Sequence, residues 1–185
     1  KESLGGVCLN WGCIPTKALL KSAQVFDYIK RSEEYGISVE NFHKNFENVV
    51  ARSRNVAKTM SKGVNFLMKK NNIKIFKGFG KLSENKSVLI SKEEGTVDTI
   101  FGDKIIIATG AKSRQLPALK QDGQNIIGYP EAMTLKEQPK NIVIVGSGAI
   151  GIEFAYFYNS MGTKVTIIEY LDRIVPVEDT DISKE

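Results

Sequence analysis

The chain of 185 residues predicts an α/β fold, because three patterns along it indicate both helices and strands. Two long stretches repeat apolar residues at helical spacing. A central segment, residues 72–110, consists of short β-branched and aromatic runs broken by glycine, which is typical of strands. Near the end, an apolar run leads into a glycine-rich turn and a further helical pattern.

Two amphipathic helices are expected before the strands. The first covers residues 15–32, where Pro15 suits the first turn of a helix. The second covers residues 45–70. Its expected apolar stripe consists of Val49, Val56, Met60, Val64 and Leu67. His43 lies just before this second helix, and we interpret it as a surface or capping residue rather than a catalytic one.

The central segment predicts three strands. They are expected within residues 73–82, 87–91 and 99–111. In the third, Ile105–Ile107 is a continuous apolar run, as expected for a strand buried on both faces. The small residues that follow it directly are Ala108, Thr109 and Gly110. On their own they predict only a turn that ends the strand, and Gly80 is placed in a predicted turn over residues 77–80.

The glycine and proline content divides the chain. Residues 115–139 contain several of both with little periodicity, so we interpret them as a linker. The predicted parts are therefore one domain over residues 1–114 and the start of a second over residues 140–185.

The second part predicts a dinucleotide-binding βαβ unit. A buried strand is expected at Asn141–Val145, a helix at residues 152–161 and a second strand at Lys164–Ile168. The turn between the first strand and the helix has the G-x-G-x-x-G residues Gly146, Ser147, Gly148, Ala149, Ile150 and Gly151. Its glycines allow a tight turn, close approach of a pyrophosphate to backbone amides, and close packing of helix on strand.

Glu169 follows the second strand directly and points to the choice of nucleotide. We expect its carboxylate to accept hydrogen bonds from the adenosine ribose hydroxyls and to repel a 2′-phosphate, which favours NAD over NADP. Arg173 is near enough to favour the opposite choice, but we interpret it as a solvated arginine.

Both cysteines of the chain lie in the segment Gly5–Lys17, with four residues between Cys8 and Cys13. One histidine and no second cysteine pair leave too few ligands for a structural metal site. Two inert buried thiols or a redox-active pair remain open. Glycines around the cysteines and Pro15 behind them place both sulfurs at or near a helix N-terminus, which favours the thiolate and therefore the redox-active pair.

The segment GGVCLNWGCIPTK resembles the redox-active disulfide segment of the pyridine nucleotide-disulfide oxidoreductases, and most of all that of the members that oxidise dihydrolipoamide. The resemblance implies a disulfide against the flavin of FAD. It also implies that Cys8 is the outer thiol, which exchanges with substrate, and that Cys13 contacts the flavin. Lys17 would lie beside the flavin, and the FAD neighbours in the segment would be Gly5, Gly6, Val7 and Lys17.

The same resemblance assigns roles outside this segment. Glu153 would pair with Lys17 near the flavin, and Gly80 would lie at the adenine end of FAD. Further FAD neighbours would be Ala108, Thr109 and Gly110. The expected architecture is then an incomplete FAD-binding Rossmann-like domain followed by the first βαβ unit of an NAD-binding Rossmann domain. We expect an internal fragment of a longer enzyme, whose missing parts include the domain that supplies a His-Glu acid-base pair across a homodimer.

Composition argues against other classes. The net charge of +5 comes from 26 dispersed basic residues offset by 21 acidic ones, so nucleic acid is not an expected partner. No apolar run approaches the roughly 20 residues of a membrane helix, so no membrane association is expected. Catalytic cysteines without an export signal indicate the cytoplasm.

Three functions are open on these grounds. The favoured one is oxidation of dihydrolipoamide, free or on the lipoyl domain of a 2-oxoacid dehydrogenase-type complex, with electrons passing through Cys8 and Cys13 and FAD to NAD⁺. The second is another reductase of the family, acting on mercuric ion or a low-molecular-weight disulfide. The third is a remnant without activity that serves as a binding or assembly module.

Overall fold

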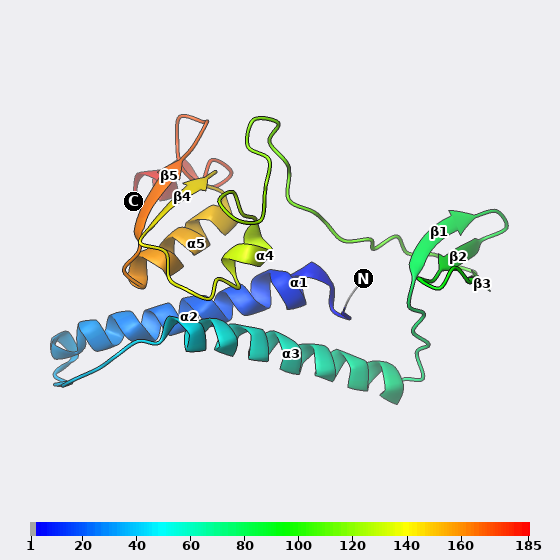
Figure 1. The fold of residues 1–185 in the computed structure, drawn as a ribbon, viewed down its shortest axis with the longest axis horizontal. Helices are drawn as coiled ribbons and strands as arrows, with labels where there is room; N and C mark the ends of the chain where they lie inside the picture. The colour runs from blue at the N-terminus through cyan, green and yellow to red at the C-terminus, as the bar shows by residue number, and fades with distance from the viewer. Residues whose placement is uncertain (1–2) are drawn as a thin grey trace.

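The computed structural model describes residues 3–185 as a helical layer, a small antiparallel sheet and a βαβ unit (Figure 1). The helical layer contains α1 (Gly6–Trp11), α2 (Cys13–Lys30), a short 3-10 helix (Ser32–Tyr35) and α3 (Phe46–Lys70). Both long helices are confirmed within two residues of the predicted starts. Asn45 caps α3, because its side chain accepts a hydrogen bond of 2.8 Å from the Asn48 amide, while His43 is exposed and caps nothing.

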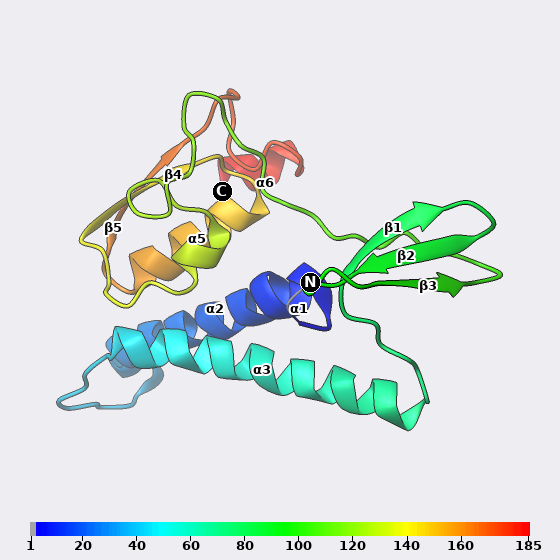
Figure 2. The same cartoon turned by 45° about the vertical axis from the view of Figure 1, so that its right-hand side comes forward.

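The apolar stripe of α3 is not covered along its whole length. Met60 and Leu67 are 47% and 48% exposed, whereas the buried residues of this helix lie nearer its start. They are Phe46, Val50, Ser53 and Ala57. The reason is geometric: α3 is the longest helix described, and Figure 2 shows its C-terminal part extending beyond α1 and α2. Periodicity indicated an apolar face along the whole helix, but the buried residues all lie in its first half.

The small sheet has the order β1 (Phe79–Ser83), β2 (Ser87–Ser91) and β3 (Val97–Phe101), all antiparallel. The strand predicted at residues 87–91 is confirmed. Gly80 lies in β1 opposite Ile90, so its placement in a turn was wrong. Residues 73–78 form no strand.

The buried strand predicted at Ile105–Ile107 is absent. These residues are irregular, and Ile106 is 89% exposed. The antiparallel sheet ends at Phe101, and within residues 3–185 no other strand lies beside the run. An extended segment without a neighbouring strand cannot pair its amides and carbonyls in a core, so it stays at the surface.

The C-terminal end of the predicted linker takes part in the core. It contains α4 (Tyr129–Ala132), and Ala132 and Met133 are buried. Glu131 caps the start of this helix, because the Gly128 amide donates a hydrogen bond of 3.0 Å to its carboxylate. The division of the chain at residues 115 and 139 stays a prediction.

The predicted βαβ unit is confirmed. Its elements are β4 (Asn141–Val145), α5 (Ala149–Ser160) and β5 (Lys164–Ile168), followed by α6 (Thr180–Lys184). β4 and β5 pair in parallel, with Asn141 opposite Lys164. The burial predicted for β4 is wrong, because only alternate residues are covered. Ile142 and Ile144 pack against the core, whereas the other face of this two-stranded sheet carries no described element.

The core lies between α2, α3, α4 and α5. Its buried members are Leu19, Ala23, Phe46, Val50, Ala132, Met133, Phe154, Phe157, Tyr158 and Met161. The Tyr158 hydroxyl donates a hydrogen bond of 2.5 Å to the Ala132 carbonyl, which satisfies its one polar group inside the cluster. α5 therefore rests on the helix that begins at Cys13, although the two are far apart in sequence.

Candidate active site

The cysteines form a disulfide between two helices. Cys8 lies within α1 and Cys13 is the first residue of α2, with 4.7 Å between their Cα atoms. Gly12 makes the turn between them, and a Cβ added there would lie 3.1 Å from the Cys8 Cα. Gly5 has a φ of 100°, and an added Cβ would meet Leu9 Cδ1 at 2.5 Å. Glycine at these two positions therefore lets α1 fold back tightly on the start of α2.

Both cysteines are exposed, so their burial does not tell outer from inner thiol. Cys13 has the more favourable position for a negative charge, because it begins an 18-residue helix whose first amides have no intrahelical partner. On opening of the disulfide, the Cys13 thiolate would face the positive end of this helix. The assignment of Cys8 as the exchanging thiol stays a prediction.

The glycine turn has the geometry expected for a pyrophosphate site. Gly146 has a φ of 101°, which favours glycine, and a Cβ on Gly151 would overlap the Gly146 carbonyl oxygen. An added Cβ on Gly148 meets nothing within 4 Å, so the backbone there is open to a ligand. Gly148 is also the N-cap of α5. The turn thus brings α5 close to β4 and leaves its N-terminus accessible, which fits the phosphates of NAD.

Glu169 lies directly beside this turn. Its Oε2 accepts hydrogen bonds from the amide and the hydroxyl of Ser147, at 2.7 and 2.6 Å. Its Oε1 accepts from the Tyr170 and Leu171 amides, at 2.8 and 3.0 Å. These bonds, that from the Ser147 hydroxyl first, lower the pKa of Glu169 to about 2. A permanently ionised carboxylate next to the turn fits the ribose end of NAD.

α2 and α5 run parallel, and this brings the two motifs to the same end of this pair of helices (Figure 1). Near their N-termini, Lys17 forms an ion pair with Glu153, with the side chains 62% and 27% exposed. The structure therefore contains the contact between these residues that the sequence led us to expect. Its function in electron transfer stays a prediction.

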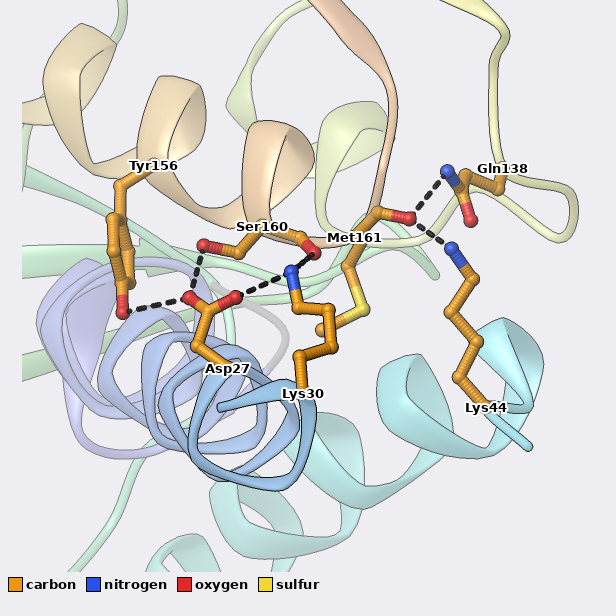
Figure 3. Close-up of polar contacts among 7 residues, drawn as sticks. All are labelled: Asp27, Lys30, Lys44, Gln138, Tyr156, Ser160 and Met161. Carbon is orange, nitrogen blue, oxygen red and sulfur yellow. Dashed lines mark hydrogen bonds and ion pairs between the residues drawn. The ribbon is translucent and has the colours of Figure 1, made fainter. Parts of the chain in front are cut away.

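The opposite ends of α2 and α5 are joined by a polar cluster (Figure 3). Asp27 of α2 accepts hydrogen bonds from the Ser160 hydroxyl at 2.7 Å and the Tyr156 hydroxyl at 3.4 Å. Lys30 forms an ion pair of 2.6 Å with Asp27 and donates to the Ser160 carbonyl at 3.2 Å. Lys44 and Gln138 both donate to the Met161 carbonyl. These donors satisfy the last carbonyls of α5 and fix it on α2.

For the other predicted cofactor neighbours, their place at the cofactor stays a prediction. Among the hydrogen bonds and ion pairs of residues 3–185, none joins Ala108, Thr109 or Gly110 to the disulfide segment or the glycine turn. Gly110 does have a φ of 82° and open space on its Cβ side, which fits close approach of a ligand. A Cβ on Gly80 would make an ordinary contact of 3.5 Å with Val88, so its geometry gives no sign of a cofactor.

Two supporting side chains had no place in the sequence predictions. Asn10 is buried, and its amide donates to the Leu4 and Gly6 carbonyls at 3.0 and 2.9 Å, which fastens α1. The Arg54 guanidinium lies 4.1 Å from the centre of the Trp11 ring, and burial lowers its pKa. A polar residue between the two cysteines could have drawn attention to Asn10. Arg54 lies in an ordinary stretch of helix and offered no signal.

Hollows and metal sites do not suggest a different centre. One hollow follows α3 around Asn55 and Met60, and another lies between α2 and α3 around Phe26 and Val49; neither contains a residue of the two motifs. Within residues 3–185 no group of three or more His, Cys, Asp or Glu side chains could hold a metal ion. In the same part of the chain, every helix is too short or too polar to cross a membrane.

An exposed disulfide at the start of α2 and a glycine turn at the start of the parallel helix α5 are the two features of a nucleotide-linked disulfide oxidoreductase. A sequence model described as pyridine nucleotide-disulphide oxidoreductase matches residues 2–185. The chain belongs to this family. Its cofactors are those of the family, FAD and NAD, as the sequence led us to expect.

Named relatives agree with this result. The chain is 45% identical over 184 residues to the dihydrolipoyl dehydrogenase of Chlorobaculum parvum, covering 100% of the chain and 39% of that protein. It is 43% identical over 194 residues to the dihydrolipoyl dehydrogenase of Bacillus subtilis, covering 100% of the chain and 41% of that protein.

Among solved structures, LpdA from Mycobacterium tuberculosis superposes with a TM-score of 0.88 at 25% identity, over 99% of this chain and 40% of LpdA. This match confirms the expected α/β architecture, part of an FAD-binding Rossmann-like domain followed by a βαβ unit. The chain spans about 40% of the length of these relatives.

Proposed function

We propose that this protein takes part in the oxidation of dihydrolipoamide to lipoamide, with electrons passing through Cys8 and Cys13 and FAD to NAD⁺. The observation that carries the proposal is the parallel pairing of α2 and α5, which puts an exposed disulfide and a nucleotide turn at one end, joined by Lys17 and Glu153. The names of the relatives support dihydrolipoamide as the substrate.

The cysteines react with the substrate by thiol-disulfide exchange. A thiolate of the substrate attacks Cys8 Sγ, a substrate–Cys8 disulfide forms, and the Cys8–Cys13 bond breaks. Cys13 leaves as a thiolate, stabilised by the amides at the start of α2. The second substrate thiol, after losing its proton to a base, attacks the substrate sulfur of the mixed disulfide and releases Cys8. The substrate becomes a cyclic disulfide, and its two electrons reside on the cysteine pair.

Bound FAD and NAD⁺ supply the hydride chemistry that returns the cysteine pair to a disulfide. The residues that would hold FAD are Gly5, Gly6, Val7, Lys17, Gly80, Ala108, Thr109 and Gly110. Those that would hold NAD are Gly146, Ser147, Gly148, Ala149, Ile150, Gly151 and Glu169. Lys17 and Glu153 would place a paired positive and negative charge where the two cofactors meet.

The expected setting follows from the same comparison. The partner would be free dihydrolipoamide or the lipoyl domain of a 2-oxoacid dehydrogenase-type complex, and the enzyme would act as a cytoplasmic homodimer. No observation favours a reductase for mercuric ion or small disulfides, or a binding module without activity, over this function.

The test is dihydrolipoamide oxidation by the FAD-loaded enzyme, followed as NADH formation. Cys8→Ser and Cys13→Ser should each abolish it, while NADH should still reduce an artificial electron acceptor through the flavin, because that route needs no disulfide. Dihydrolipoamide oxidation that survives either substitution would overturn the proposal. Activity with NADPH and a small disulfide, but none with dihydrolipoamide, would support the other reductases instead.

A further inference from the structure

We propose that Ser147 is a positioning residue that sets the preference for NAD over NADP, by holding both the Glu169 carboxylate and the loop that carries Arg173. The inference rests on the proposed binding of NAD at the glycine turn. It concerns how this chain achieves the choice of nucleotide rather than which nucleotide it chooses.

Ser147 is fully buried at the centre of three segments. Its amide and its hydroxyl both donate to Glu169 Oε2, at 2.7 and 2.6 Å. Its hydroxyl oxygen also accepts a hydrogen bond of 3.2 Å from the Val175 amide, which lies 3.2 Å from the Ser147 carbonyl as well. One buried hydroxyl therefore connects the glycine turn, the end of β5 and the loop of residues 170–178.

The hydrogen bonds to Glu169 fix both the position and the orientation of its carboxylate group. Each carboxylate oxygen accepts two hydrogen bonds, the second pair coming from the Tyr170 and Leu171 amides. Protein donors therefore hold both oxygens of the carboxylate. A charge held in this way cannot turn toward solvent when a second negative group approaches. It therefore opposes a 2′-phosphate more strongly than a mobile carboxylate would.

The hydrogen bonds from the Val175 amide determine where the positive charge of Arg173 lies. Val175 has a φ of 42°, which is unfavourable for a β-branched residue, so its conformation depends on the contacts of its backbone. In this loop conformation the Arg173 guanidinium donates a hydrogen bond of 2.7 Å to the Pro176 carbonyl. The arginine is thus retained within its own loop. Without the Ser147 hydroxyl, the loop would relax and Arg173 would become available to a phosphate.

The effects of Ser147 on Glu169 and on Arg173 both disfavour binding of a 2′-phosphate. Removing its hydroxyl should therefore weaken the preference for NAD over NADP. The probes are AMP and adenosine 2′,5′-bisphosphate, which differ only in the 2′-phosphate, with their binding to the FAD-loaded enzyme measured by calorimetry. In Ser147→Ala the ratio of the two dissociation constants should shift by about tenfold toward the bisphosphate, the size expected for loss of one charge-assisted hydrogen bond.

Ser160→Ala is the matched control. Ser160 is also a buried serine that donates to a carboxylate, at 2.7 Å to Asp27, but it lies at the other end of α5. In Ser160→Ala the ratio of the two dissociation constants should be the same as in the wild type. An equal shift in both variants, or none in Ser147→Ala, would overturn the inference. Ser147→Gly removes the same hydroxyl without adding any atom to the buried site, and it provides the same test should Ser147→Ala fold poorly.

A second background separates positioning from a general structural effect. In a Glu169→Gln, Arg173→Gln double variant the two groups through which Ser147 acts are neutral, so adding Ser147→Ala should leave the ratio unchanged. A shift of the same size there would overturn the inference. Failure of the wild type to bind either nucleotide would overturn the proposed function as well, whereas binding of AMP with an unaltered ratio in Ser147→Ala overturns only the role of Ser147.

Discussion

The two ends of the α2–α5 pair are built in opposite ways. At the N-terminal end lie an exposed disulfide, an open glycine turn and a partly exposed ion pair between Lys17 and Glu153. At the C-terminal end, the Asp27 carboxylate accepts a hydrogen bond from the Ser160 hydroxyl, and Lys30 donates to the Ser160 carbonyl (Figure 3). Between the two ends lies the aromatic core. The comparison teaches that stability and chemistry are separated along one pair of helices, and substitutions can test that separation.

The largest loss of stability is expected at the centre. Phe157 is 1% exposed, and its ring centre lies 5.0 Å from that of Tyr158. Phe157→Ala should lower the free energy of unfolding by about 3–5 kcal/mol, because it removes a buried ring and leaves a cavity. Urea unfolding measures the change. Phe66→Ala is the control at a 64% exposed position and should cost less than about 0.5 kcal/mol. Equal losses would contradict the location of the core.

The next effect is expected at the glycine turn, where packing and binding meet. Gly151→Ala would place a Cβ against the Gly146 carbonyl oxygen and force α5 away from β4. It should cost about 1–3 kcal/mol of stability as well as affinity for AMP. Gly148→Ala is the control, because its Cβ meets no protein atom within 4 Å. It should lower AMP affinity at nearly unchanged stability. A stable Gly151→Ala with normal AMP binding would show that the close packing is not needed.

The polar cluster around Asp27, at the C-terminal end of the α2–α5 pair, should stabilise the fold in a way that depends on pH. Desolvation raises the pKa of Asp27, but hydrogen bonds from Lys30, Ser160 and Tyr156 outweigh it, so the pKa is below its ordinary value. A carboxyl whose pKa is depressed on folding stabilises the protein above its unfolded pKa, and this contribution is lost as pH falls through the folded pKa.

Asp27→Asn should therefore cost about 1 kcal/mol at neutral pH, with the difference from wild type shrinking in acid. Urea unfolding at several pH values measures it. The control is Asp181→Asn, which removes an exposed ion pair with Lys184 and should change little at any pH. A cost for Asp27→Asn that is constant with pH would mean that its charge does not hold the helices together.

The smallest effect on stability, less than about 0.5 kcal/mol, is expected for Lys17→Met and Glu153→Gln, because the pair is partly exposed and Lys17 largely so. Their effect should instead be on function, as a slower reduction of the flavin by NADH in stopped-flow measurements. Lys21→Met, one turn further along α2 and also exposed, is the matched control and should leave this rate unchanged. Unchanged rates in Lys17→Met and Glu153→Gln would show that the contact has no functional meaning.

Local patterns predicted the elements well, because helix periodicity and glycine turns are properties of neighbouring residues. The helices α2 and α3 and the βαβ unit all follow from them. What covers an apolar face depends on segments distant in sequence. This is why Met60 and Leu67, in the apolar stripe of α3, are exposed, and why Ile105–Ile107 were predicted buried but are exposed.

The same distinction applies to the site. The disulfide segment and the glycine turn are local motifs, so both could be located from the sequence. The proximity of Lys17 to Glu153 was expected only through resemblance to a family, since 136 positions separate them. The cluster around Asp27 and the stacking of Arg54 on Trp11 had no counterpart in any motif. Such contacts follow from how α2 packs on α3 and α5.

The packing of α5 on α2 also affects how the chain folds while it is being synthesised. During synthesis α2 and α3 emerge first, and their apolar residues, Leu19 and Phe46 among them, lack the cover that Phe157 and Tyr158 later provide. The contact between Lys30 and Ser160 spans 130 positions, and contacts of such separation form late. The apolar residues of α2 and α3 therefore stay partly exposed to solvent until α5 has been synthesised. A chaperone would be needed during this interval.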